Sequence, residues 1–125
     1  MTTTTTDTKK LDKRGLPAAL KTAAKAALDK KAEDLKILDL RGTSAFTDFF
    51  IIMHGNSGRQ NAAIVDAVED ALKQSKLRPL GIEGKAHGEW ILMDYGAFIV
   101  HVFSRAARDY YAMEKLWADA PRAAY

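Results

Sequence analysis

The chain has 125 residues, a formal net charge of +3 and no cysteine. A chain of this length fits one domain, and the lack of cysteine excludes disulfides, thiolate catalysis and cysteine-ligated metal sites. The sequence has no run of about 18 apolar residues and no charged-then-apolar start, which argues against a membrane-spanning helix and a secretory signal. We therefore expect a single cytoplasmic domain that makes no membrane contact.

The positive charge is concentrated near the N-terminus. Residues 1–31 carry eight Lys and Arg against three Asp, a net of +5, whereas residues 32–125 carry eleven Lys and Arg against thirteen Asp and Glu, a net of −2. A basic segment indicates contact with nucleic acid phosphates. Any contact with RNA, such as ribosomal RNA, is therefore expected from the N-terminal segment.

Residues 1–14 begin with a threonine run and have no apolar periodicity, so they are predicted to form a disordered N-terminal tail. Apolar residues around Pro17 then recur at helical spacing, which predicts an amphipathic helix; they are Leu16, Leu20, Ala24, Ala27 and Leu28. We favour a helix that packs on the domain. A basic helix that contacts RNA is one alternative. An organelle transit peptide is the other, and it is disfavoured because such peptides avoid acidic residues; this segment holds Asp7, Asp12 and Asp29.

Two strands and a helix follow. Residues 35–41 have the composition of a strand, and residues 48–53 form a continuous apolar run that predicts a buried central strand. Residues 54–59 are predicted to form a loop before a helix of about 17 residues. Ser57 and Gln60 have the spacing of a capping box, in which each side chain satisfies a free amide at the helix start.

The C-terminal half is predicted to hold three more strands. Residues 79–83 form a short extended piece, and residues 90–94 and 98–103 are two strands. Tyr95-Gly96 joins these two strands and is a hairpin turn by residue type.

A last helix is expected from about Ser104 to Trp117, with Tyr110, Met113 and Trp117 packed on the sheet. Residues 121–125 are assigned to a C-terminal tail. The order is helix, two strands, helix, three strands, helix, which allows one crossover. It predicts a single α/β (α+β) domain over residues 15–120, with a mixed sheet of about five strands flanked by helices.

The residues do not form a recognisable catalytic, cofactor-binding or metal site. The loop at residues 55–59 lies where many proteins cradle phosphate, but the Lys-Ser/Thr pair of a P-loop is missing, so we favour a structural turn and helix cap. The acids Asp39, Asp48 and Asp94 are single residues on different strands, unlike the clustered carboxylates that hold magnesium. His101 is expected to be a hydrogen-bonded core residue. We therefore expect neither an enzyme nor a cofactor.

Four pieces of the sequence carry a family likeness. They are TDFFIIMHGNSGRQ at 47–60, GIEG at 81–84 with EWILMDYG at 89–96, IVHVF at 99–103, and YYAMEKLW at 110–117. In this order and spacing they resemble the Iojap-like ribosomal silencing factors, over about residues 18–117. The threonine-rich start and the last eight residues lie outside the resemblance.

The resemblance implies a ribosome-binding protein. Members of that family bind the large ribosomal subunit through its fourteenth ribosomal protein, block joining of the small subunit and so repress translation under nutrient limitation. The resemblance also implies a fold related to the nucleotidyltransferases without their catalytic residues. Family members often dimerise off the ribosome, so a homodimer is a further expectation.

One predicted strand carries residues suited to a protein partner. Strand alternation places Trp90, Leu92 and Asp94 on one face, and Tyr95 with Ile91 and Met93 on the other. Taken alone, Trp90 would be interpreted as packing under a helix. With the resemblance we favour an interface, because Trp is common at interaction hot spots.

The charges near Trp90 favour a protein over RNA. Residues 80–103 hold three acids against Lys85 alone, so they suit a basic ribosomal protein better than phosphates. The predicted contact is centred on Glu83, Trp90 and Asp94, with Leu80 and Tyr95 beside them.

Two other functions remain open. A nucleotidyltransferase-related protein would bind a nucleoside triphosphate with magnesium. An RNA-binding module acting through Lys9 to Lys31 would tolerate Trp90→Ala, lose binding when the tail is removed, and bind less tightly as salt rises.

Overall fold

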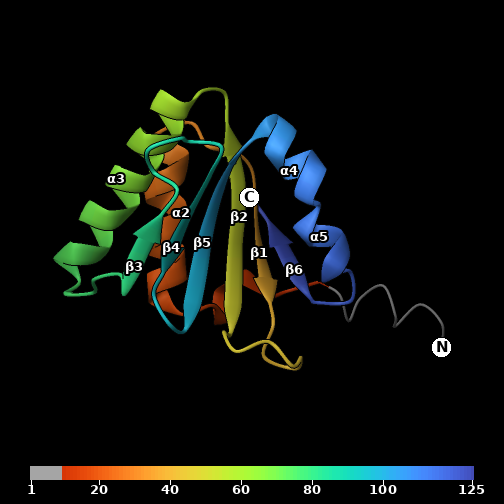
Figure 1. Ribbon diagram of the computed structural model, residues 1–125. Coiled ribbons are helices and arrows are strands. Elements are labelled where there is room, and N and C mark those ends of the chain that lie inside the picture. The colour runs from red at the N-terminus through yellow and green to blue at the C-terminus, as the bar shows by residue number, and fades with distance from the viewer. Residues whose placement is uncertain (1–9) are drawn as a thin grey trace.

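In the computed structural model, which describes residues 10–125, six strands form one mixed sheet in the order β3-β4-β5-β2-β1-β6 (Figure 1). The predicted α+β domain with a mixed sheet and flanking helices is confirmed, with one strand more than the expected number of about five. The elements are η1 (Lys13–Gly15), α2 (Ala18–Asp29), β1 (Glu33–Asp39), β2 (Phe49–Gly55), α3 (Gly58–Gln74), β3 (Gly81–Glu83), β4 (Trp90–Asp94), β5 (Phe98–Ser104), α4 (Arg105–Tyr111), α5 (Met113–Leu116) and β6 (Arg122–Ala124).

Strand β2 lies inside the sheet and is buried along its whole length. It pairs in parallel with β5, from Phe49 opposite Phe98 to Gly55 opposite Ser104, and antiparallel with β1. The apolar run that predicted a buried central strand is therefore confirmed. Parallel strands need a crossover connection, and the chain makes it through α3, β3 and β4. The hairpin that returns it to β5 turns at Gly96, whose φ is +81°.

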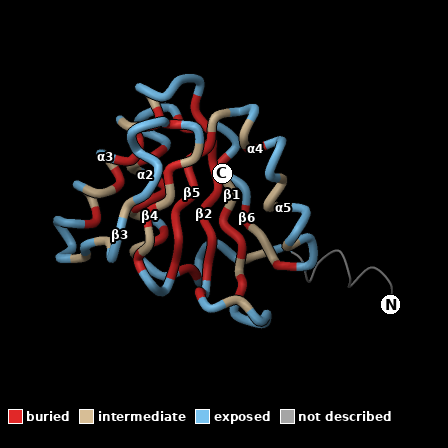
Figure 2. Tube along the Cα trace, in the orientation of Figure 1, coloured by how far each residue is buried: buried red, intermediate tan, exposed pale blue. Residues whose placement is uncertain are grey.

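Helices α2 and α3 cover one face of the sheet (Figures 1 and 2). The predicted packing of α2 through an apolar stripe is confirmed for Leu20, Ala24 and Ala27, which are buried while the lysines of α2 are exposed. Leu28 was predicted to belong to the same stripe, but it is 37% exposed. Burying one leucine side chain contributes about 1.5–3 kcal/mol. The sheet side of this core is built from Ile37, Ile51, Met53, Ile91, Met93, Val100 and Val102.

The opposite face is partly covered by α4 and α5. The prediction of a single helix from Ser104 to Trp117 is wrong. Ala112 has a left-handed backbone (φ +47°), and it separates α4 from α5. The break changes the helical phase. Met113 and Trp117 still pack against the sheet, as predicted, but Tyr110 is 82% exposed and does not.

The C-terminal tail and the described end of the N-terminal tail both contact the sheet edge. The assignment of residues 121–125 to a tail is wrong, since Lys36 of β1 pairs with Ala124 and Leu38 pairs with Arg122. These pairs use the edge of β1 that β2 leaves free. Leu11 in turn donates its backbone N–H to the carbonyl of Arg122 at 2.9 Å. The end of the predicted tail at residues 1–14 is therefore folded, and residues 1–9 lie outside the described residues.

Candidate protein-binding site

The face of the sheet opposite α2 and α3 is open over β3 and β4. Trp90, Leu92 and Asp94 lie on this face, as alternation predicted, while Ile91 and Met93 enter the core beneath α2 and α3. Glu83 of β3 pairs with Leu92, and Leu92 pairs with His101 of β5. In Figure 1, α4 and α5 lie toward the β6 edge, and Tyr111 of α4 reaches Trp90, whereas no helix lies over this face at β3. We call the surface of Glu83, Trp90, Leu92 and Asp94 the open sheet face.

Trp90 is half-buried and held on three sides. Its indole Nε1 donates a hydrogen bond to Nδ1 of His101 at 3.1 Å. Its ring centroid lies 5.1 Å from that of Phe103 and 4.6 Å from that of Tyr111 on α4. The indole therefore has a fixed orientation before any partner arrives, which lowers the conformational entropy that binding would cost.

His101 is a core residue, as predicted. Its side chain is 2% exposed and lies edge-on to Phe50, with ring centroids 4.5 Å apart. Burial lowers the pKa of His101 from 6.5 to about 4, so the ring is neutral at pH 7. Because Nδ1 accepts from Trp90, the single proton of the neutral ring resides on Nε2, which has no hydrogen-bond partner within residues 10–125.

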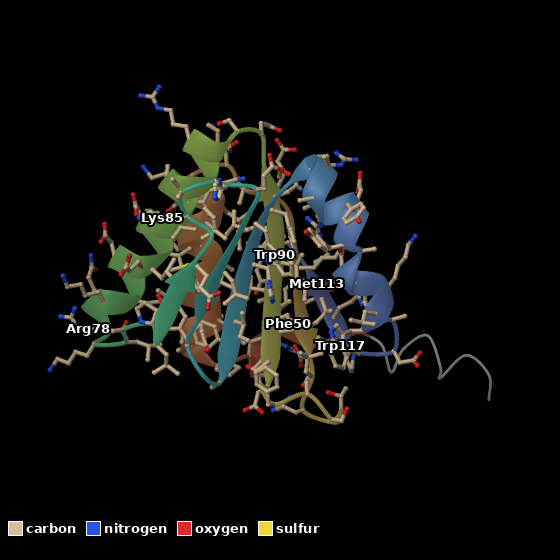
Figure 3. The ribbon with its side chains drawn as sticks, in the orientation of Figure 1. Phe50, Arg78, Lys85, Trp90, Met113 and Trp117 are labelled. Atoms are coloured by element: carbon tan, nitrogen blue, oxygen red, sulfur yellow. The ribbon has the colours of Figure 1, made fainter. Side chains whose placement is uncertain are left out.

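Aromatic side chains continue from Trp90 across the sheet toward α5. Figure 3 shows Trp90, Phe50, Met113 and Trp117 along the same side of the sheet. Phe50 and Trp117 meet edge to face at 6.2 Å between ring centroids. Leu116, next to Trp117, is 75% exposed. Together these residues form an apolar band with exposed atoms at its margins, of the kind that protein partners cover.

Acidic residues border the band on the β3 side. Glu83 is exposed, and Asp94 is half-buried. The Oδ1 atom of Asp94 accepts a hydrogen bond from the backbone N–H of Gly96 at 2.8 Å, so Asp94 also holds the hairpin turn. Leu80, which is 77% exposed, lies beside Gly96. Glu83, Trp90 and Asp94 thus share one face of β3 and β4, while Leu80 lies just before β3, close to the hairpin turn.

Tyr95 is the one predicted contact residue that the structure removes from this surface. Its side chain is 7% exposed, belongs to the core under α2 and α3, and stacks on Phe98 at 4.9 Å between ring centroids. Burial raises the pKa of Tyr95 to about 12. The prediction that Tyr95 lies beside the contact is wrong, because strand alternation continues through Asp94 and directs the next side chain inward.

Arg108 is an important residue that the sequence reasoning missed. It is 5% exposed, and Nε and Nη2 donate to the two carboxylate oxygens of Glu114 at 3.0 Å each. Its Nη1 lies 3.0 Å from Nδ1 of His54 and 3.4 Å from the carbonyl of Glu33, and Nη2 lies 3.6 Å from Asp34. The signal available was a charged residue on the helix face that packs against the sheet. Arg108 joins α4 and α5 to β1 and β2, and so positions one border of the open sheet face.

The electrostatics around Arg108 are those of a closed cluster. Burial, followed by the charge of Arg108, lowers the pKa of His54. Burial raises the pKa of Glu114, but hydrogen bonds and charge from Arg108, with Lys36, hold it below its usual value. A cavity of about 540 Å³ opens beside this cluster at the carboxyl ends of β2 and β5, where ligands often bind in α/β proteins. Because four hydrogen bonds and an ion pair engage the guanidinium within the chain, we interpret Arg108 as structural.

The loop before α3 is a helix cap, as favoured from the sequence. The Ser57 hydroxyl accepts from the backbone N–H of Gln60 at 3.0 Å, and Oε1 of Gln60 accepts from the N–H of Asn56 at 2.7 Å. Those amides are therefore used within the chain. Residues 10–125 hold no group of three or more His, Asp or Glu side chains placed to bind a metal ion. They also hold no helix long and apolar enough to cross a membrane.

Comparison with known proteins gives consistent matches. A family model described as ribosomal silencing factor during starvation matches residues 13–124. The ribosomal silencing factor RsfS of Bacillus subtilis is 44% identical over 104 residues, which cover 83% of this chain and 88% of that protein. A crystal structure of a protein from Chromobacterium violaceum superposes with a TM-score of 0.78 at 37% identity, covering 81% of this chain and 84% of the other.

Relatives from organelles are longer. The mouse protein named mitochondrial assembly of ribosomal large subunit protein 1 is 32% identical over 89 residues, which cover 69% of this chain and 39% of that protein. The chloroplastic protein Iojap of maize is 31% identical over 97 residues, which cover 78% of this chain and 42% of that protein.

Proposed function

Because this chain belongs to the ribosomal silencing factor family, as its four sequence segments predicted, we propose that it binds the large ribosomal subunit and blocks joining of the small subunit. The names of its bacterial relatives support a silencing role, and the name of the mouse relative refers to the large subunit. Bound there in the cytoplasm, the protein represses translation under nutrient limitation. The action is steric, so it needs a binding surface and no catalytic residue.

The observation that carries this proposal is the open sheet face with its fixed indole. A large aromatic anchor beside apolar surface and an acidic border is the composition of an interaction hot spot. Glu83 and Asp94 would attract a basic ribosomal protein and repel ribosomal RNA phosphates. We assign the fourteenth protein of the large subunit as the partner, following the family resemblance. Trp90 is the centre of the contact, with Glu83, Asp94 and Leu80 around it.

Co-sedimentation with isolated ribosomal subunits tests the proposal. The wild-type protein should travel with the large subunit, not the small one, and should prevent subunit joining. Trp90→Ala should weaken binding by more than about tenfold, as expected for a hot-spot aromatic. Glu83→Lys should weaken it as well, and it is a cleaner charge reversal than one at Asp94, which holds the hairpin turn.

A matched control keeps the result specific. Asp70→Lys makes the same change of charge as Glu83→Lys at an exposed position of α3, which covers the opposite face of the sheet, and should bind like the wild type. Wild-type binding by both Trp90→Ala and Glu83→Lys would refute this surface. A protein that stays at the top of the gradient would refute the subunit proposal itself.

A further inference from the structure

A second surface lies at the β6 edge, on the α2 side of the sheet. Residues from η1, from α2 and from the segment after β6 enclose a groove of about 530 Å³. We call it the basic groove, and its main lining residues are Lys13, Arg14, Lys21, Lys25, Leu28 and Tyr125. None of the residues of the open sheet face lines it. The groove is within the range of about 300–1,000 Å³ that small ligands occupy.

The rim of the basic groove is positively charged. Four cations face a single acid, Asp29, among its lining residues. Lys25 pairs with Asp29 at 3.5 Å, but these side chains are 78% and 67% exposed, and such exposed pairs contribute about 1 kcal/mol at most. Within residues 10–125 the side chains of Lys13 and Lys21 form no ion pair. Arg14 pairs with Asp12 at 3.3 Å, so the cations available to an anionic partner are Lys13, Lys21 and the weakly paired Lys25.

The floor of the groove is apolar and aromatic. Tyr125 is 39% exposed and Leu28 is 37% exposed. The backbone N–H of Tyr125 donates to the carbonyl of Leu35 at 2.9 Å. This hydrogen bond attaches Tyr125 to the edge of the sheet. The ammonium of Lys13 lies 4.3 Å from the Tyr125 ring centroid. An exposed aromatic ring bordered by cations is the combination by which proteins stack a base and hold the adjoining phosphates.

We propose that the basic groove binds a single-stranded segment of RNA, with one base on Tyr125 and Leu28 and the phosphates along Lys13, Lys21 and Lys25. Single-stranded RNA fits better than a duplex, because a base must be unstacked to reach a ring inside a groove. This inference goes beyond the proposed function, since it concerns a different surface and a different class of partner. The cation on the Tyr125 ring, Lys13, would move to a phosphate.

Fluorescence anisotropy with a labelled single-stranded RNA of about ten nucleotides, a length within the range of known single-strand sites, tests the inference on the full chain. Three lysine–phosphate contacts predict a slope of about −2 in log K against log salt. The double variant Lys21→Glu/Lys25→Glu should weaken binding by more than about tenfold and flatten that slope. The matched control Lys73→Glu/Lys76→Glu makes the same charge change at exposed positions at the end of α3 and should bind more tightly than the groove variant.

The aromatic part has its own variants. Tyr125→Ala should weaken binding by about tenfold without changing the salt slope, because it removes stacking and leaves the charges. Tyr125→Phe keeps the ring and should bind like the wild type. Thermal unfolding of each variant verifies that it is folded, and Lys21→Ala/Lys25→Ala serves if the charge reversal unfolds the chain.

Three results would overturn the inference: equal affinity for RNA of the two double Lys→Glu variants, an unchanged affinity in Tyr125→Ala, or equally tight binding of an acidic peptide or a duplex RNA. The assay contains no ribosome, and Trp90→Ala should bind the oligonucleotide like the wild type. Failure here is therefore distinguishable from failure of the subunit proposal, which depends on Trp90.

Discussion

The indole of Trp90 donates its hydrogen bond to a histidine, His101, that stays neutral because it is buried, with 3.1 Å between Nε1 and Nδ1. A protonated imidazole carries N–H groups on both nitrogens and cannot accept this bond. The orientation of the residue at the centre of the open sheet face therefore depends on the charge state of one core residue. Protonation of His101 should lower the stability of the fold, and loss of its acceptor nitrogen should weaken partner binding.

Stability should fall as pH falls below 6.5. The unfolded His101 binds a proton near pH 6.5, whereas the folded one does so near pH 4, so the unfolded state gains protons first as the solution is acidified. The resulting loss of unfolding free energy is absent above pH 6.5, grows as pH falls, and reaches about 3 kcal/mol near pH 4. Urea unfolding above pH 6.5 and near pH 4 measures it.

The comparison for this measurement is His101→Gln, which cannot gain a proton and keeps an acceptor for Trp90. The pKa of His54 is lowered too, so His54 contributes in the same direction in both proteins and cancels in the difference. The wild type should lose more stability on acidification than His101→Gln. Identical losses in the two proteins would show that His101 does not control the acid response.

Binding should depend on His101 as a positioning residue. His101→Phe removes the acceptor for the indole while retaining a ring beside Phe50. A hydrogen bond of this kind contributes about 0.5–1.5 kcal/mol, so subunit binding should weaken by up to about tenfold. His101→Gln, which restores an acceptor, should recover part of the loss. If His101 only stabilised the fold, His101→Phe and His101→Gln variants of equal stability would bind the subunit equally.

Arg108 should be a stability residue. Arg108→Ala leaves the partly buried Glu114 carboxylate with only Lys36, at 3.5 Å, as a cationic partner, and breaking a buried pair of this kind costs about 3 kcal/mol. Arg105→Ala, three positions earlier on α4, removes a 70% exposed side chain and should cost about 0.5 kcal/mol or less. Urea unfolding measures the free energy of unfolding of both variants. Equal costs would mean that the Arg108 contacts do not hold α4 and α5 in place.

Gly84 should be intolerant of any side chain. Its φ is +84°, and a Cβ atom there would collide with the backbone carbonyl oxygen of Trp90. Gly84→Ala should therefore destabilise the protein by about 2 kcal/mol and weaken subunit binding, because the start of β4 must shift. Gly81→Ala, where an added Cβ meets open space, should cost about 0.5 kcal/mol or less. If Gly84→Ala and Gly81→Ala have the same melting temperature, the close approach of Gly84 to Trp90 does not limit the residue at position 84.

Local sequence patterns were enough for the parts of the fold that repeat with a short period. The apolar run at residues 48–53 predicted buried β2, and the spacing of Ser57 and Gln60 predicted the cap of α3. Alternation along β4 placed Trp90 with Leu92 and Asp94. Each of these features is encoded by residues that are close neighbours in the sequence, so a short stretch of sequence is enough to show it.

Long-range contacts decided the rest. Arg108 meets His54 and Glu114 from three separate segments, β6 is a strand because β1 offers it a free edge, and Tyr125 reaches Lys13 across the whole chain. Local patterns in the sequence predicted most of the elements, and alternation along β4 predicted the opposite faces that carry Trp90 and Tyr95. The folded chain alone revealed that Ala112 breaks the last helix, that residues 122–124 form β6, and that a basic groove exists. Pairing between distant residues follows no local period, so it becomes visible only when the folded chain brings those residues together.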